Sequence, residues 1–166
     1  MNTIENLVEK LGMKPHPEGG WYVETYRSGE TINRTALPKR FTGDRCFSTA
    51  IYFLVPAGVF SAFHRIRSDE CWHYYEGVPL GIYVINAIGE LSIIKLGKNM
   101  DEGEVFQAMV PAGCWFASMP FSEDGFSFVG CTVSPGFDFE DFELAERETL
   151  TAIFPMHKNL IDRLCR

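Results

Sequence analysis

The sequence predicts an all-β protein, an antiparallel sandwich or barrel. Short apolar segments alternate with turn residues, aromatic residues make up 14% of the chain, and there are 15 glycines and 9 prolines. Hydrophobic residues make up 46% of the chain, which excludes a disordered protein. We expect a single domain over residues 1–166, because this length suits one domain and no linker or low-complexity tract divides it.

The N-terminal part predicts a helix, a turn and a strand. Apolar side chains recur at helical spacing over residues 2–11, which predicts a short helix. Residues 16–20 (HPEGG) predict a tight turn, and residues 21–28 alternate as a strand. Residues 28–43 are polar and predict an exposed loop.

The rest of the chain alternates between strand and turn patterns and then closes with helices. The expected strands are residues 46–55, 59–66, 70–76, 79–86, 90–96, 105–110, 114–118, 125–133 and 137–144. Two short helices are expected over residues 145–153 and 157–164, separated by Pro155. Strands at this spacing without intervening helices favour an antiparallel sheet protein.

Charge and cysteine content limit the partners and the location. With 15 basic and 22 acidic residues the net charge is −7, which argues against nucleic acid and anionic membranes as partners. The N-terminus lacks the pattern of a signal peptide, and the longest apolar stretch, residues 50–63, is interrupted and too short to span a bilayer. The five cysteines include no CxxC pair, which is typical of reduced thiols and predicts a cytoplasmic location.

The segment Gly58–Gly77, GVFSAFHRIRSDECWHYYEG, has the most informative spacing. It is similar to the first cupin motif, G-x5-H-x-H-x3-E-x6-G. His64 and Glu70 match the motif, and Ile66 stands where the second histidine would be.

The second cupin motif, G-x5-P-x-G-x2-H-x3-N, is only partly present. Its turn matches at residues 111–113, but Phe116 replaces the histidine and no asparagine fills the last position.

Several further segments extend the resemblance: HPEGGWYVETYRS, AIYFLVPAG, VPAGCWFAS and GCTVSPGFDFEDFEL. Together they resemble a small cupin family without an established biochemical role, sometimes called cupin family five, over most of residues 12–144. The resemblance implies a double-stranded β-helix (cupin jelly roll), here with short N-terminal and C-terminal helices, usually dimeric and with a pocket inside the barrel. It implies no reaction. The segment Trp21–Arg27 is our candidate for covering a sheet edge across the two-fold axis of a homodimer.

The spacing also predicts where the motif residues point. Residues two apart in a strand share a face, so Glu70, Trp72 and Tyr74 point together, and so do His64 and Ile66. If both sets face the interior, His64 and Glu70 meet in an apolar pocket. Such a pair suits general acid–base chemistry, with His64 as base and Glu70 as its orienting carboxylate. Tyr74 is the candidate acid from its position on the strand, and Tyr22, Tyr26, Tyr52 and Tyr83 are alternatives. The alternative is a structural pair that satisfies itself inside the core.

A metal is not the primary expectation. A full cupin site offers three histidines and one glutamate, whereas this chain keeps only His64 and Glu70 of that set. The replacements Ile66 and Phe116 remove two ligands and fill the space. A divalent metal at His64 and Glu70 stays open as an alternative, with Glu24 as a third oxygen ligand if its strand lines the cavity.

Other residues are candidates for ligand binding rather than catalysis. Arg27 suits an anionic group, and Gln107 could donate a hydrogen bond from an otherwise apolar strand. Trp72 and Phe116 could form an aromatic wall for a ring-shaped ligand such as a sugar. Each also has a structural interpretation, as a solvated side chain, a cross-strand hydrogen bond or core packing.

These observations predict a small-molecule-binding cupin. The leading hypothesis is a metal-independent isomerase or epimerase that acts on a carbohydrate-type metabolite, similar to the metal-free sugar-nucleotide epimerases. One alternative is a non-catalytic cupin that binds or senses the same kind of ligand. The other is a metal-dependent cupin enzyme with an incomplete ligand set.

Overall fold

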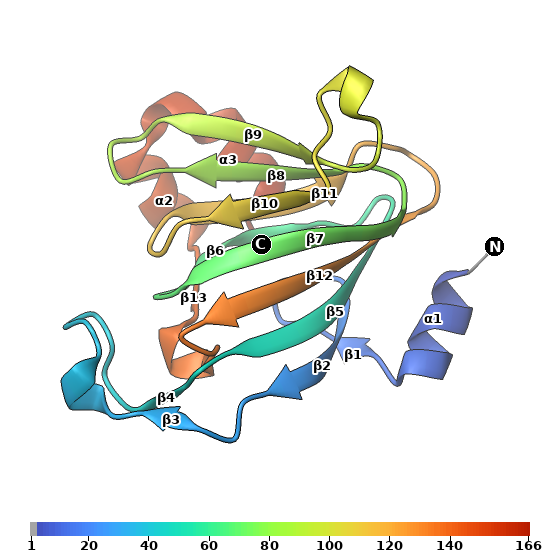
Figure 1. Cartoon of the computed structure of the whole chain (residues 1–166). Coiled ribbons are helices and arrows are strands. Elements are labelled where there is room, and N and C mark those ends of the chain that lie inside the picture. The colour runs from blue at the N-terminus through green and yellow to red at the C-terminus, as the bar shows by residue number, and fades with distance from the viewer. Residues whose placement is uncertain (1–2) are drawn as a thin grey trace.

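The computed structural model describes residues 3–166 and contains two antiparallel β-sheets with a shared core (Figure 1). The first sheet runs, edge to edge, β1 (Lys14–Pro15), β2 (Trp21–Arg27), β5 (Thr49–Pro56), β12 (Phe126–Ser134), β7 (Asp69–Gly77) and β10 (Gln107–Val110). The second runs β13 (Glu143–Leu144), β6 (Ser61–Arg65), β11 (Trp115–Pro120), β8 (Leu80–Ile85) and β9 (Leu91–Leu96). This confirms the predicted all-β jelly roll.

The short helices that the sequence predicts are present, and they cover the outer faces of both sheets. Helix α1 (Ile4–Leu11) begins after Thr3, whose side chain caps the first turn, and packs against the first sheet. Helices α2 (Arg147–Ile153) and α3 (Lys158–Leu164) pack against the second sheet, behind β8 in Figure 1. Residue 2, where the predicted N-terminal helix starts, lies outside the described residues. Within residues 3–166, every helix is too short or too polar to cross a membrane.

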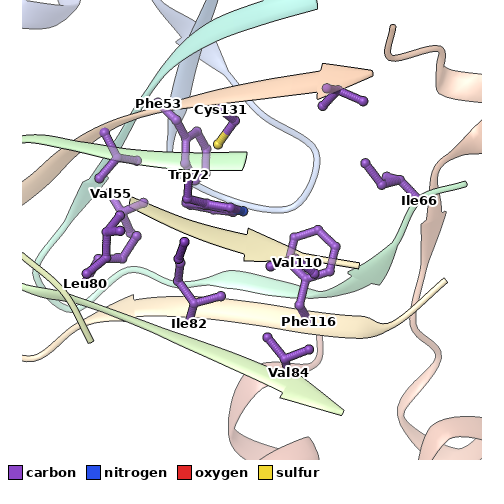
Figure 2. Close-up of a cluster of buried hydrophobic side chains, with 14 residues drawn as sticks. Phe53, Val55, Ile66, Trp72, Leu80, Ile82, Val84, Val110, Phe116 and Cys131 are labelled. Carbon is purple, nitrogen blue, oxygen red and sulfur yellow. The ribbon is translucent and has the colours of Figure 1, made fainter. Parts of the chain in front are cut away.

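The inner faces of the two sheets bury one continuous hydrophobic core (Figure 2). Large side chains that belong to it are Phe53 of β5, Trp72 of β7 and Phe116 of β11, all about fully buried. Strand alternation explains the arrangement, because residues two apart on each strand point between the sheets. Aromatic and branched side chains therefore fill much of the barrel interior.

The segments between strands depart most from the predicted pattern. Residues 137–144, predicted as a strand, form a 3₁₀ turn η3 (Phe139–Asp141) and only the short strand β13. The Asp138 side chain accepts a hydrogen bond from the backbone N–H of Glu140 at 2.9 Å, which favours a turn over an extended chain. The predicted loop 28–43 contains β3 (Thr31–Ile32), which pairs with β4 (Arg45–Cys46), and the 3₁₀ turn η1 (Arg34–Ala36). The other 3₁₀ turns are η2 (Met100–Glu102) and η4 (Pro155–His157).

Strand β2 contains a β-bulge that decides which of its side chains face inward. Its register against β5 shifts between Glu24 and Tyr26, so that strict alternation ends at Thr25. As a result Tyr22, Glu24 and Arg27 all line the interior cavity. The same strand pairs with β1 and β5 of its own chain, and the homodimer stays a prediction.

Two glycines of the first cupin motif have different roles. Both have positive φ, +79° at Gly58 and +101° at Gly77, which favours glycine. A Cβ on Gly77 would lie 2.0 Å from the carbonyl oxygen of Phe126, whereas a Cβ on Gly58 would meet nothing within 4 Å.

We therefore expect Gly58→Ala to cost about 1 kcal/mol of unfolding free energy, from the backbone conformation alone. Gly77→Ala should cost at least about 1 kcal/mol more, because the β7–β12 backbone must also move. Urea denaturation of both variants measures the difference. Equal losses would contradict this account of Gly77.

Candidate functional site

A cavity of about 230 Å³ lies between the two sheets and is lined largely by strands of the first. Its apolar walls come from Ile51, Phe53, Ile66, Val133, Phe137 and Phe139. Buried polar side chains, among them Glu18, His64 and Glu70, form its interior, while the exposed residues Lys14, Glu24 and Arg27 line its mouth. The cavity therefore combines titratable groups with hydrocarbon walls.

The centre of the cavity is a buried pair formed by Glu18 and His64. The Glu18 carboxylate lies 3.0 Å from His64 Nε2 and accepts a hydrogen bond from the Ser61 hydroxyl at 2.9 Å. The other ring nitrogen, Nδ1, lies 2.7 Å from the carbonyl oxygen of Ala62. A carbonyl oxygen only accepts, so Nδ1 carries a hydrogen. Both ring nitrogens of His64 are therefore engaged.

The pKa shifts of both groups favour the ionised form of this pair. Burial alone would raise the pKa of Glu18, but the charge of His64 and hydrogen bonds from His64 and Ser61 outweigh it and lower this pKa. Burial alone would lower the pKa of His64, but the Glu18 carboxylate raises it above 6.5. His64 is thus an imidazolium that donates from both nitrogens, paired with a carboxylate that is only 6% exposed.

Glu70 lies in the same cavity, but its pKa is shifted in the opposite direction to that of Glu18. Burial raises its pKa to about 7, although the positive His64 opposes this change. The neighbouring Cys131 thiol has a pKa raised well above 9 by burial and by Glu70, so it stays protonated and can donate to the carboxylate. Glu70 therefore gains and loses its proton near neutral pH, which suits a general acid or base.

The carboxylate partner of His64 is thus Glu18 rather than the predicted Glu70. The interpretation of residues 16–20 as a tight turn was correct but incomplete: the His16 N–H donates to the carbonyl oxygen of Gly20. This turn packs so closely on the start of β6 that a Cβ on Gly19 would lie 2.1 Å from the carbonyl oxygen of Phe60. The close approach buries Glu18 beside His64. Gly19 and Gly20 are the features of the sequence that could have indicated this close approach.

The turn also brings in His16, whose position in HPEGG predicts only a role in the turn. Its Nδ1 lies 3.5 Å from the Glu18 carboxylate. Burial lowers the pKa of His16, while the charge of Glu18 partly opposes that change. His16 is therefore a neutral neighbour of the ionised pair at physiological pH.

At the mouth, Glu24 and Arg27 line the cavity as expected but bind each other. Arg27 donates to both carboxylate oxygens of Glu24, at 3.0 and 2.7 Å, and also to the carbonyl oxygen of Phe137 at 3.1 Å. These contacts engage both the guanidinium and the carboxylate within the protein. Lys14, which the sequence analysis did not single out, lies at the same mouth.

Two of the predicted ligand-binding residues face inward but lie in the core. Trp72 packs edge-on against Phe53 and Phe116, and the Phe116 ring lies 4.1 Å from the His64 ring. Neither Trp72 nor Phe116 is among the residues that line the cavity of this chain over residues 3–166. They support the walls from behind, because hydrocarbon fills that end of the barrel.

The other two predicted residues lie away from the cavity. The Tyr74 hydroxyl donates to the carbonyl oxygen of Gly77, on its own strand. The Gln107 amide nitrogen lies 2.9 Å from His73 Nδ1, in an exposed cross-strand contact between β10 and β7. The geometry thus brings His64, Glu70, Glu24 and Arg27 together and leaves these two outside.

The residues present do not fit a cupin-type metal site. Ile66 and Phe116 supply hydrocarbon where two histidine ligands would be, and His64 Nε2 is bonded to Glu18. The proposed third ligand, Glu24, is bound by Arg27. Across residues 3–166, no group of three or more His, Cys, Asp or Glu side chains has metal-binding geometry.

Two antiparallel sheets that enclose a cavity, with His64 on β6 of one sheet and Glu70 on the following strand, β7, of the other, define a cupin-type jelly roll. The family described as "Cupin superfamily (DUF985)" matches residues 5–145, and the chain belongs to it.

Similar proteins agree with this assignment. The structure of protein SO0799 from Shewanella oneidensis is 40% identical, with a TM-score of 0.90 over 100% of this chain and 99% of that one. A hypothetical protein from Leishmania major is 33% identical, with a TM-score of 0.88 over 99% of both chains. The uncharacterized protein YML079W of Saccharomyces cerevisiae is 28% identical over 89% of this chain and 77% of its own length.

More distant structures share the fold alone. Oxalate decarboxylase from Bacillus subtilis is 16% identical, with a TM-score of 0.54 over 90% of this chain and 36% of that protein. The present chain thus corresponds to about a third of oxalate decarboxylase.

Proposed function

We propose that the cavity binds a small carbohydrate-type metabolite and moves a proton on it without a metal, as an isomerase or epimerase does. The observation that carries this proposal is Glu70, a buried carboxyl group with a pKa of about 7 in a ligand-sized cavity. The cytoplasmic location and the homodimer that the sequence predicts are parts of the same proposal.

The roles of the cavity residues follow from their protonation. The Glu70 carboxylate takes a proton from the carbon beside a carbonyl group of the ligand, and the electron pair of that C–H bond moves into an enolate. The imidazolium of His64 acts on the enolate oxygen only through its charge, which Glu18 partly offsets, because Glu18 and the Ala62 carbonyl oxygen take both of its N–H groups. For isomerisation, Glu70 then returns the proton to the neighbouring, former carbonyl carbon while the proton of the adjacent hydroxyl group moves to the enolate oxygen. For epimerisation, a solvent proton adds to the opposite face of the first carbon and Glu70 releases its proton to solvent. Neither route needs an oxidant or reductant. Glu18 acts as a positioning residue that keeps His64 charged.

The engaged ring nitrogens of His64 favour a second candidate function, a non-catalytic binding module. An imidazole that donates to both Ala62 and Glu18 cannot accept a proton, so His64 is not the base of the leading hypothesis. In a binding module the same groups would orient a ligand without turnover.

Deuterium exchange tests the proposal and separates these functions. Sugars and sugar acids that contain a carbonyl group are incubated with the protein in deuterium oxide, and mass spectrometry follows label at the neighbouring carbon. We expect the wild type to incorporate label into at least one compound, and Glu70→Gln to slow this about 100-fold or more. Glu123→Gln, which removes an exposed carboxylate, is the control. Binding in thermal-shift assays without exchange would favour the binding module.

A further inference from the structure

The charges that line the cavity are unevenly compensated. Glu18 pairs with His64 in the interior, and Glu24 pairs with Arg27 at the mouth. Lys14 differs: over residues 3–166, no carboxylate oxygen lies within 4.0 Å of its Nζ, which sits 5.1 Å from the centre of the Tyr22 ring. The mouth therefore has one positive charge that the described protein leaves unpaired, on a chain whose net charge is −7.

The size of the cavity limits what can enter it. Its volume of about 230 Å³ equals that of roughly eight molecules of liquid water at ~30 Å³ each. Sites for drug-sized ligands generally start at about 300 Å³. The space inside the mouth suits one sugar or carbocyclic ring, so the nucleotide of a nucleotide-linked sugar would have to lie outside it.

The walls favour a ring over an extended chain. Tyr22, Phe53 and Phe137 present aromatic surface to the cavity between its mouth and its interior. Such surfaces pack well against the flat face of a ring, whose polar substituents can then point to either end. One end reaches Lys14 and the other reaches Glu70.

From these features we propose that the ligand is a compact, ring-sized organic anion whose anionic group pairs with Lys14 at the mouth. Its other end lies against Glu70, and only this last placement rests on the function proposed above. The contact with Lys14 selects the anion, and the limited volume at the inner end disfavours conjugates that are enlarged on the side of the ring facing Glu70.

Matched pairs of probes test the charge selection. Isothermal calorimetry compares D-glucuronate with D-glucuronamide, and cyclohexanecarboxylate with its amide, because the two members of each pair have nearly the same shape and only one is charged. We expect at least one carboxylate to bind about 10-fold or more tightly than its amide, as a charge-assisted contact gives. Lys14→Gln should abolish this preference. Lys10→Gln, an exposed lysine on α1 outside the cavity lining, should keep it.

Size selection gives a second readout. UDP-glucuronate carries the same ring on a nucleotide and should bind at least about 10-fold more weakly than glucuronate. Carboxylates that bind no better than their amides, or that bind equally well to the Lys14→Gln variant, overturn the proposal. So does an absence of binding by every carboxylate tested.

These results are independent of the exchange experiment. A preference for the anion that depends on Lys14, without any deuterium exchange, would overturn only the proposed catalytic function. Exchange that depends on Glu70 but acts on neutral sugars, without a role for Lys14, would overturn only the anion proposal.

Discussion

Glu70→Gln is expected to stabilise the protein by about 3 kcal/mol at about pH 8, and to change its stability little near pH 4.5. Burial raises the pKa of this carboxyl group from 4.5 to about 7 in the folded protein. The unfolded chain therefore releases the proton at lower pH than the folded protein does, and stability is lost as the pH rises between these two values. A neutral glutamine removes that loss.

Urea denaturation at several pH values measures this effect. The difference in unfolding free energy between Glu70→Gln and wild type should grow from about pH 4.5 to about pH 7 and then level off. Glu123→Gln serves as the control for removing an exposed charge. A Glu70→Gln variant that is less stable than wild type at pH 8 would mean that the Glu70 carboxylate is stabilised in the fold. Its role as a proton acceptor near neutral pH would then be untenable.

Asp141→Asn is expected to lower the unfolding free energy by about 3 kcal/mol or more. Arg45 and Asp141 form a bidentate ion pair with distances of 2.7 and 2.6 Å, and both side chains are only 3% exposed. Neutralising Asp141 leaves the buried Arg45 guanidinium with only the exposed Glu140 carboxylate, 3.6 Å away, as a counter-charge. For a chain of this length the loss corresponds to a melting temperature lower by roughly 6–12 °C.

An exposed ion pair provides the comparison. Arg65 and Glu143 also lie 2.7 Å apart, but their side chains are 41% and 54% exposed, so Glu143→Gln should cost less than about 1 kcal/mol. Thermal and urea unfolding of both variants show whether the loss of stability depends on the burial of the ion pair or only on the distance between its charges. A loss of similar size in both would contradict the buried role of Arg45. Because Asp141 lies between Phe139 and Phe142, the same pair also holds one wall of the cavity in place.

The strand pattern could be predicted because it depends on local signals. Pro-Ala-Gly turns and alternating apolar residues mark the strands from β5 to β12, and their bounds agree closely with the structure. The segment 137–144 could not be predicted, because its aromatic residues alternate like a strand while Asp138 caps a turn. There the side-chain hydrogen bond outweighs the periodicity.

The candidate site was only partly predictable for a related reason. Alternation correctly brings His64 and Glu70 to one cavity, since both lie on strands that face its interior. The contribution of Glu18 depends on how a turn packs against β6, and that of Arg27 depends on a bulge. The extent to which Trp72 and Phe116 fill the barrel could not be predicted from the sequence either. Tertiary packing decides these points.

The hydrocarbon that fills the barrel behind His64 affects how a ligand enters and leaves the cavity. With Trp72 and Phe116 packed at the inner end, a molecule that enters past Lys14 has to retrace its route to leave. A ligand then enters and a product leaves through the same mouth of the cavity. Any compound released by this protein should therefore compete directly with the next incoming molecule.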